Sequence, residues 1–139
     1  MQTNSLEGKV ILWIEDDTAL RDLVATRISQ EQCIILHAEY GADGLRSAAA
    51  QKPDLIMLDI QMPGMDGFEI LTRLKADAQT KAIPVIMLSN LDDPESVKKA
   101  LQLGALDFLA KSTETPGSIV EKMRAALAKS NAQHQCIVC

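Results

Sequence analysis

The sequence predicts a single α/β domain in which five parallel β-strands alternate with five α-helices. Short apolar runs alternate with helical patterns along the chain, which is typical of a parallel sheet covered by helices on both faces. The strand-like runs are also almost continuously apolar, as in Leu55–Leu58, and this pattern indicates strands buried on both faces. With 139 residues, of which 47% are apolar, the chain can build one sizeable core and leaves no room for a second domain.

Each expected strand is a short aliphatic run bounded by polar or turn-forming residues. Pro53 enforces an extended backbone where the chain enters the third strand, and Pro84 opens the fourth strand, where a missing backbone donor is tolerated. We interpret Trp13 as a core residue, and His37 as a strand-end or loop histidine rather than a catalytic base. The expected strands are Val10–Ile14, Cys33–His37, Leu55–Leu58, Val85–Leu88 and Asp107–Ala110.

Each expected helix shows apolar residues at helical spacing or a residue type that starts or stops helices. The first helix carries Leu20, Leu23, Val24 and Ile28 in one stripe. In the fourth helix, a proline occupies the first turn and a glycine follows the last turn. The expected helices are Thr18–Gln30, Gly41–Gln51, Gly67–Ala76, Pro94–Leu103 and Gly117–Lys129. Residues 9–129 therefore form the expected domain, with an N-terminal extension at 1–8 and a C-terminal tail at 130–139.

The composition argues against several classes of function. A formal net charge of −5 makes the chain a poor general binder of nucleic acid or of anionic membranes, so we expect neither as a direct partner. No stretch approaches the ~20 apolar residues of a transmembrane helix, and the polar N-terminus shows no secretion signal. Cys33 lies in an apolar run and is most simply a reduced core residue, which fits a cytoplasmic location.

Polar side chains gather where the expected strands end. In an open α/β sheet, ligands bind outside the carboxyl ends of the strands. Three carboxylates at this edge are costly unless a cation compensates them, and hard oxygen ligands favour Mg²⁺. The set suits phosphoryl chemistry, because carboxylates form aspartyl phosphates while a lysine and a hydroxyl hold the remaining phosphoryl oxygens. The residues are Glu15 and Asp16 after the first strand, Asp59 after the third, Ser89 after the fourth and Lys111 after the fifth.

Four segments carry a resemblance to a known family. They follow the family's order and spacing, and they are Ile11–Asp17, Pro53–Gly67, Pro84–Ser89 and Gly104–Lys111. From about Lys9 to Lys129, the chain resembles the receiver domain of response regulators, a CheY-like domain of two-component signalling. The resemblance implies a flavodoxin-like sheet with the strand order 2-1-3-4-5.

The resemblance also implies roles for four residues at a phosphorylation site. Asp59 matches the family's phosphoacceptor. Asp16 matches a direct Mg²⁺ ligand, and Glu15 matches a residue that acts on the metal through water. The backbone carbonyl of Gln61 matches the third protein ligand. The implied cofactor is therefore Mg²⁺, held by Glu15, Asp16, Asp59 and Gln61.

Three further residues match the positions with which the family senses the phosphoryl group. Lys111 matches the lysine that pairs with a phosphoryl oxygen. Ser89 matches the hydroxyl residue that hydrogen-bonds the phosphoryl group and shifts on activation. Phe108 matches the aromatic switch residue, which turns inward when Ser89 moves.

The resemblance implies a phospho-accepting signalling domain rather than a turnover enzyme. A sensor histidine kinase or a phosphotransfer protein would donate the phosphoryl group, and the domain would assist its own phosphorylation and dephosphorylation. The fourth helix, fifth strand and fifth helix would form the switching face, for an unidentified downstream protein or for a second copy of the chain in a homodimer. No output domain follows in the sequence, so we expect a stand-alone receiver or an excised part of a larger regulator.

One departure from the family keeps an alternative open. The family usually has a proline after the lysine, with a cis peptide bond, whereas Ser112 follows Lys111 here. Either this bond is cis at a cost of roughly 3–4 kcal/mol, or the loop takes another course. The alternative function is a phosphorylation-independent interaction module with the same fold. An aspartate-based phosphatase is disfavoured, because Gln61 stands where that class places a general acid.

Overall fold

Five strands and five helices alternate along the chain in the computed structural model, which describes residues 6–16, 18–29, 31–90 and 93–138. The predicted fold class is confirmed, and each expected strand is present within one residue of its predicted ends. The strands are β1 Val10–Ile14, β2 Ile34–Ala38, β3 Leu55–Asp59, β4 Val85–Ser89 and β5 Asp107–Ala110. The helices are α1 Ala19–Arg27, α2 Gly41–Gln51, α3 Gly67–Ala76, α4 Pro94–Gln102 and α5 Pro116–Val138.

All five strands are parallel and lie in the order β2-β1-β3-β4-β5, as predicted. The strand order reverses between β1 and β3, and ligand sites of open α/β sheets form at such a reversal. Ile14 at the end of β1 is in register with Leu58, one residue before the end of β3. The topology therefore places the acidic residues that follow β1 beside Asp59, although 44 positions separate the two segments in the sequence.

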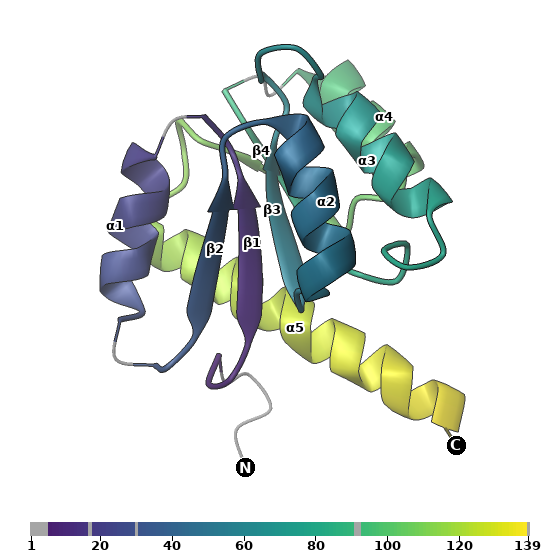
Figure 1. The fold of residues 1–139 in the computed structure, drawn as a ribbon. Coiled ribbons are helices and arrows are strands. Elements are labelled where there is room, and N and C mark those ends of the chain that lie inside the picture. The colour runs from purple at the N-terminus through teal and green to yellow at the C-terminus, as the bar shows by residue number, and fades with distance from the viewer. Residues whose placement is uncertain (1–5, 17, 30, 91–92, 139) are drawn as a thin grey trace.

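Helices cover both faces of the sheet, with α1 and α5 on one face and α2, α3 and α4 on the other (Figure 1). Side chains alternate between the faces, so that Ile11 and Trp13 of β1 pack in the core beneath α1 and α5. Leu12 and Ile14 pack in the opposite core. All four side chains are fully buried. Because both faces need apolar residues, the strands are almost continuously aliphatic.

The last helix is longer than the sequence analysis predicts. We expected a helix over Gly117–Lys129 followed by a separate tail, whereas α5 runs from Pro116 to Val138. Residues 130–138 contain neither proline nor glycine to stop the helix, so it continues through the expected tail. Figure 1 shows α5 extending past the edge of the sheet toward the C-terminus. In the part of the chain that the structure describes, no helix, α5 included, is long and apolar enough to span a membrane.

The first helix is shorter than predicted. It begins after Thr18, which stands at the N-cap position without a capping hydrogen bond from its side chain, and it ends at Arg27. Ile28 follows as the C-cap residue, and Gln30, the predicted end, lies outside the described residues. Helix ends fray and are the least reliable part of a sequence-based assignment.

Candidate functional site

Asp59 is the last residue of β3, and its carboxylate lies at the carboxyl edge of the sheet. The side chain is only 7% exposed. Its Oδ2 atom accepts a hydrogen bond from Lys111 Nζ at 3.1 Å, and its Oδ1 atom accepts one from the backbone N–H of Gln61 at 3.3 Å. One donor from its own loop and one donor from beyond β5 therefore hold the carboxylate.

The loop after Asp59 turns back tightly against the end of β3. The backbone N–H of Gly67 donates to the carbonyl of Ile60 at 2.8 Å, and Asp66 caps α3 by accepting from the N–H of Glu69 at 2.9 Å. A Cβ atom on residue 67 would lie 2.4 Å from the carbonyl oxygen of Asp59, so the close approach requires glycine. This packing fixes the start of α3 relative to the Asp59 carboxylate.

Lys111 follows β5 directly and reaches across the sheet edge to two carboxylates. Its backbone N–H donates to the carbonyl of Ser89 at 2.8 Å, which continues the pairing of β4 with β5. Its ammonium forms ion pairs with Asp59 and with Glu15. No peptide bond among the described residues is cis, so the bond to Ser112 is trans. The loop thus takes a course without the cis bond and still places the ammonium on Asp59.

Glu15 is the most enclosed of the site's carboxylates. The residue is fully buried, and its Oε2 atom accepts from Lys111 while its Oε1 atom accepts from the indole N–H of Trp13 at 2.6 Å. The ring of His37 donates through Nε2 to the backbone carbonyl of Glu15 at 2.9 Å. Both carboxylate oxygens and the backbone carbonyl of Glu15 are therefore engaged by protein donors.

The sequence analysis assigned neither Trp13 nor His37 to the site, yet both contact Glu15. The sequence pattern that could have indicated the contact of Trp13 with Glu15 is their two-residue spacing, since residues at this spacing share one face of an extended strand. For His37, the signal was its place at the end of β2, the strand that pairs with β1. Neither pattern by itself specifies a hydrogen bond.

Burial and like charges shape the ionisation of this cluster. Burial raises the pKa of the Asp59 carboxyl, and the negative charge of Asp16 adds to the rise, whereas Lys111 and the N–H of Gln61 oppose it. Burial also raises the pKa of Glu15, against the hydrogen bonds from Lys111 and Trp13. For Lys111, burial favours the neutral amine, but Glu15 and then Asp59 outweigh it, so the pKa of the ammonium is raised. The lysine stays charged among carboxylates that outnumber it.

The other predicted site residues lie around this buried centre. Asp16 is exposed and close enough to Asp59 for its charge to raise the pKa of that carboxyl. Ser89 is buried at the end of β4, beside Ala110 of β5. Phe108 is half-buried and packs against the core beneath α2, α3 and α4. The structure thus brings Glu15, Asp59 and Lys111 into contact, and places Asp16 and Ser89 on the same edge of the sheet.

The oxygen donors at this edge fit a magnesium ion. Asp16 and Asp59 offer carboxylates and Gln61 a backbone carbonyl, an all-oxygen set of the kind that Mg²⁺ takes. Within the described residues, no three histidine, cysteine, aspartate or glutamate side chains form a metal cluster. Mg²⁺ needs no such cluster, since it is commonly held by one or two carboxylates and keeps several waters.

Comparisons with known proteins identify the family and the fold of the chain. The family model of the response regulator receiver domain matches residues 11–124. The transcriptional regulatory protein AfsQ1 of Streptomyces coelicolor is 33% identical over 124 residues, which are 88% of this chain and 53% of AfsQ1. Protein PilH of Pseudomonas aeruginosa is 32% identical over 118 residues, which are 85% of this chain and 97% of PilH. The chain spans about half the length of AfsQ1 and of other transcriptional regulators that it matches.

Solved structures show the same fold. A CheY-like response regulator receiver domain protein from Methanospirillum hungatei has a TM-score of 0.81 at 25% identity, over 90% of this chain and 98% of that protein. The BeF3-activated N-terminal receiver domain of RstA from Klebsiella pneumoniae has a TM-score of 0.75 at 29% identity, over 85% and 97% of the two chains. Since the family model spans all the strand ends that form the site, the chain belongs to the response regulator receiver domain family.

Proposed function

We propose that this receiver domain is a phosphorylation-controlled switch in which Asp59 accepts the phosphoryl group. The donor is a sensor histidine kinase or a phosphotransfer protein. The observation that carries the proposal is the half-buried ammonium of Lys111, which contacts the carboxylates of both Asp59 and Glu15 at the carboxyl edge of the sheet. A cation fixed beside a potential nucleophile is the arrangement that phosphoryl transfer requires, because negative charge accumulates on the transferred group.

The transfer makes one bond and breaks another. A carboxylate oxygen of Asp59 attacks the phosphorus of a phosphohistidine, the new P–O bond forms, and the P–N bond breaks. The electron pair stays on the imidazole nitrogen of the donor. Lys111 lies 3.1 Å from Asp59 Oδ2, and this proximity supports a role as donor to a phosphoryl oxygen. In dephosphorylation, water attacks the phosphorus of the aspartyl phosphate and inorganic phosphate is released. This hydrolysis restores the Asp59 carboxylate. The domain in this way assists both its phosphorylation and its dephosphorylation.

Asp16, Asp59 and the carbonyl of Gln61 are the groups that would hold Mg²⁺. When bound, the ion supplies positive charge to the phosphoryl oxygens. Asp16 is exposed at the sheet edge, and its charge raises the pKa of the Asp59 carboxyl, so the two carboxylates are close enough to share a cation. A role of Glu15 toward the metal through water stays a prediction.

Ser89 and Phe108 are the residues through which the phosphorylated state would reach the surface. Ser89 ends β4, and Phe108 of β5 is in register with Met87, two residues earlier on β4. A shift of Ser89 toward the phosphoryl group would alter the pairing of these strands next to Phe108. The half-buried ring can then move further into the core against which it packs. The switching face proposed here consists of α4, β5 and α5.

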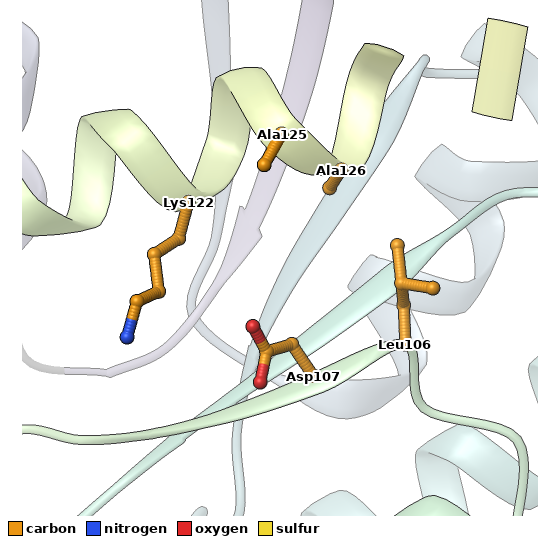
Figure 2. A pocket seen from close by; sticks show the side chains of 5 residues that line it. All are labelled: Leu106, Asp107, Lys122, Ala125 and Ala126. Carbon is orange, nitrogen blue, oxygen red and sulfur yellow. The ribbon is translucent and has the colours of Figure 1, made fainter. Parts of the chain in front are cut away.

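This face contains a small hollow of about 70 Å³ between the start of β5 and α5. Figure 2 shows Leu106 and Asp107 on one side of the hollow and Lys122, Ala125 and Ala126 of α5 on the other. Asp107 and Lys122 carry opposite charges at the same rim. Across a twofold axis, each of them can face its opposite charge on a second copy of the chain. A homodimer through this face is therefore one proposed output, besides an unidentified downstream protein.

The test of the proposed function is incubation with acetyl phosphate and Mg²⁺, followed by intact-mass measurement. We expect wild type to gain one phosphoryl group and Asp59→Asn to gain none. Asp54→Asn is the matched control, because Asp54 precedes the same strand at the opposite edge, where it accepts from the N–H of Val10 at 2.8 Å. The alternative, a phosphorylation-independent module, predicts no uptake in any of the three proteins and equal partner affinity in wild type and Asp59→Asn.

A further inference from the structure

The indole of Trp13 donates directly to the carboxylate that pairs with the site's lysine. Trp13 Nε1 lies 2.6 Å from Glu15 Oε1, a short bond of the kind formed with a charged acceptor. Lys111 donates to the other oxygen of the same carboxylate. Trp13 and Glu15 are both fully buried. The contacts form a chain from Trp13 through Glu15 and Lys111 to Asp59.

The rigidity of the two donors differs. The Trp13 ring is enclosed in the core beneath α1 and α5 and has only two side-chain torsions. Lys111 has a flexible four-carbon stem and a point charge that fixes no direction by itself. The position of the Lys111 ammonium between Glu15 and Asp59 therefore depends on where the Glu15 carboxylate is held. The indole of Trp13 is a rigid side-chain donor to that carboxylate.

We propose that Trp13 is a positioning residue of the phosphoacceptor site: its indole N–H fixes Glu15 as the counter-ion of Lys111 and thereby places Lys111 against Asp59. The inference rests on the proposed function, since it concerns how the lysine that serves Asp59 is held. It gives Trp13 a polar task besides filling the core. A phenylalanine would fill most of the same volume but would leave Oε1 of Glu15 without this donor.

The hydrogen bond itself can be tested without any phosphorylation. The chain has one tryptophan, so a proton–nitrogen correlation spectrum of labelled protein shows a single indole N–H signal. We expect this signal to lie downfield, to move upfield in Glu15→Gln and to move in Lys111→Ala. Ile11→Val is the matched control, because Ile11 packs in the same core on the same strand without touching Glu15. A signal that is unchanged in Glu15→Gln contradicts the proposed contact.

The positioning role is tested by the initial rate of phosphorylation with acetyl phosphate at saturating Mg²⁺. Loss of one hydrogen bond to a charged group predicts a rate about fivefold lower or more in Trp13→Phe. In Ile11→Val we expect the wild-type rate. In a Lys111→Ala background, Trp13→Phe should cause no further loss, since Trp13 acts through Lys111. Equal rates in Trp13→Phe and Ile11→Val would show that Trp13 only fills the core.

The two proposals fail in different ways. If wild type takes up no phosphate, the proposed function is wrong, while the indole signal still decides whether Trp13 holds Glu15. If wild type is phosphorylated at Asp59 and Trp13→Phe is phosphorylated equally fast, the positioning role is wrong and the proposed function stands. A thermal melt of each variant confirms that the rates compare folded proteins.

Discussion

Lys111 Nζ lies 3.1 Å from Asp59 Oδ2, so a side chain that follows β5 contacts a carboxylate at the end of β3, 52 positions away in the sequence. The contact forms although Ser112 follows the lysine and the intervening peptide bond is trans. The departure from the family's usual lysine–proline pair thus leaves the lysine within reach of the candidate phosphoacceptor.

Removal of the lysine should destabilise the protein strongly. In Lys111→Ala, two buried carboxylates lose their cation, and breaking a buried ion pair on one side costs about 3 kcal/mol or more at neutral pH. Lys122→Ala is the control, since Lys122 pairs with Glu114 at 3.3 Å near the surface, where the loss is about 1 kcal/mol or less. Urea unfolding measures both variants, and equal losses would contradict the account.

Neutralising Asp59 should stabilise the metal-free protein and weaken its response to Mg²⁺. Burial and the charge of Asp16 disfavour the ionised Asp59 carboxylate in the folded state. Because Asp59→Asn removes this charge, it should raise the free energy of unfolding of the metal-free protein. In wild type, Mg²⁺ at about 100 times its dissociation constant should add about 2.7 kcal/mol of stability. Thermal melts with Mg²⁺ and with a chelator measure the difference. If the melting temperature of wild type is the same with Mg²⁺ and with a chelator, the result would count against the metal site.

The stability of the metal-free protein should depend on pH through the same carboxyls. The pKa values of Asp59 and Glu15 are raised in the folded state above their ordinary values of 3.8 and 4.5. The stability that their protonated forms contribute is therefore present below those ordinary values and is lost as the pH rises through the raised folded values. Urea unfolding across this range, in the presence of a chelator, should show a smaller loss in Asp59→Asn than in wild type. Parallel curves would show that Asp59 titrates normally.

A methyl group on Gly67 should disturb the site from the backbone. Its Cβ would lie 2.4 Å from the carbonyl oxygen of Asp59, and overpacking of this kind costs about 1–3 kcal/mol. We expect Gly67→Ala to be less stable and to be phosphorylated more slowly. Gly8→Ala is the control: it meets no atom within 4 Å, but its φ of +76° costs about 1–2 kcal/mol. If both variants are phosphorylated at the wild-type rate, the loop does not position Asp59.

The sequence analysis predicted the strands well, because a buried parallel strand leaves a plain aliphatic run such as Leu55–Leu58. It also predicted that Glu15, Asp59 and Lys111 meet at the sheet edge, since parallel strands bring their carboxyl ends together. The extension of α5 was missed because residues 130–135 are mostly polar, and polarity alone does not stop a helix. The contact between Trp13 and Glu15 was missed because an aromatic side chain on a buried strand is normally core.

The switch roles of Ser89 and Phe108 and the binding of Mg²⁺ stay predictions, because they depend on free energies that the fold alone does not determine. Ser89 is buried at the end of β4 and Phe108 is half-buried beside the core, and both positions are compatible with an ordinary structural role. Their movement depends on a free-energy difference between two states of the domain. Magnesium binding depends on the balance between desolvation and the charges of Asp16 and Asp59.

The chemical identity of the phosphorylated atom tests the central claim most directly. Wild type is incubated with acetyl phosphate and Mg²⁺, reduced with borohydride and digested, so that an aspartyl phosphate is converted to homoserine. The account predicts homoserine at position 59 in the peptide from β3, and none in protein treated without phosphodonor. Homoserine at another aspartate, or phosphate uptake that is undiminished in Asp59→Asn, would contradict it.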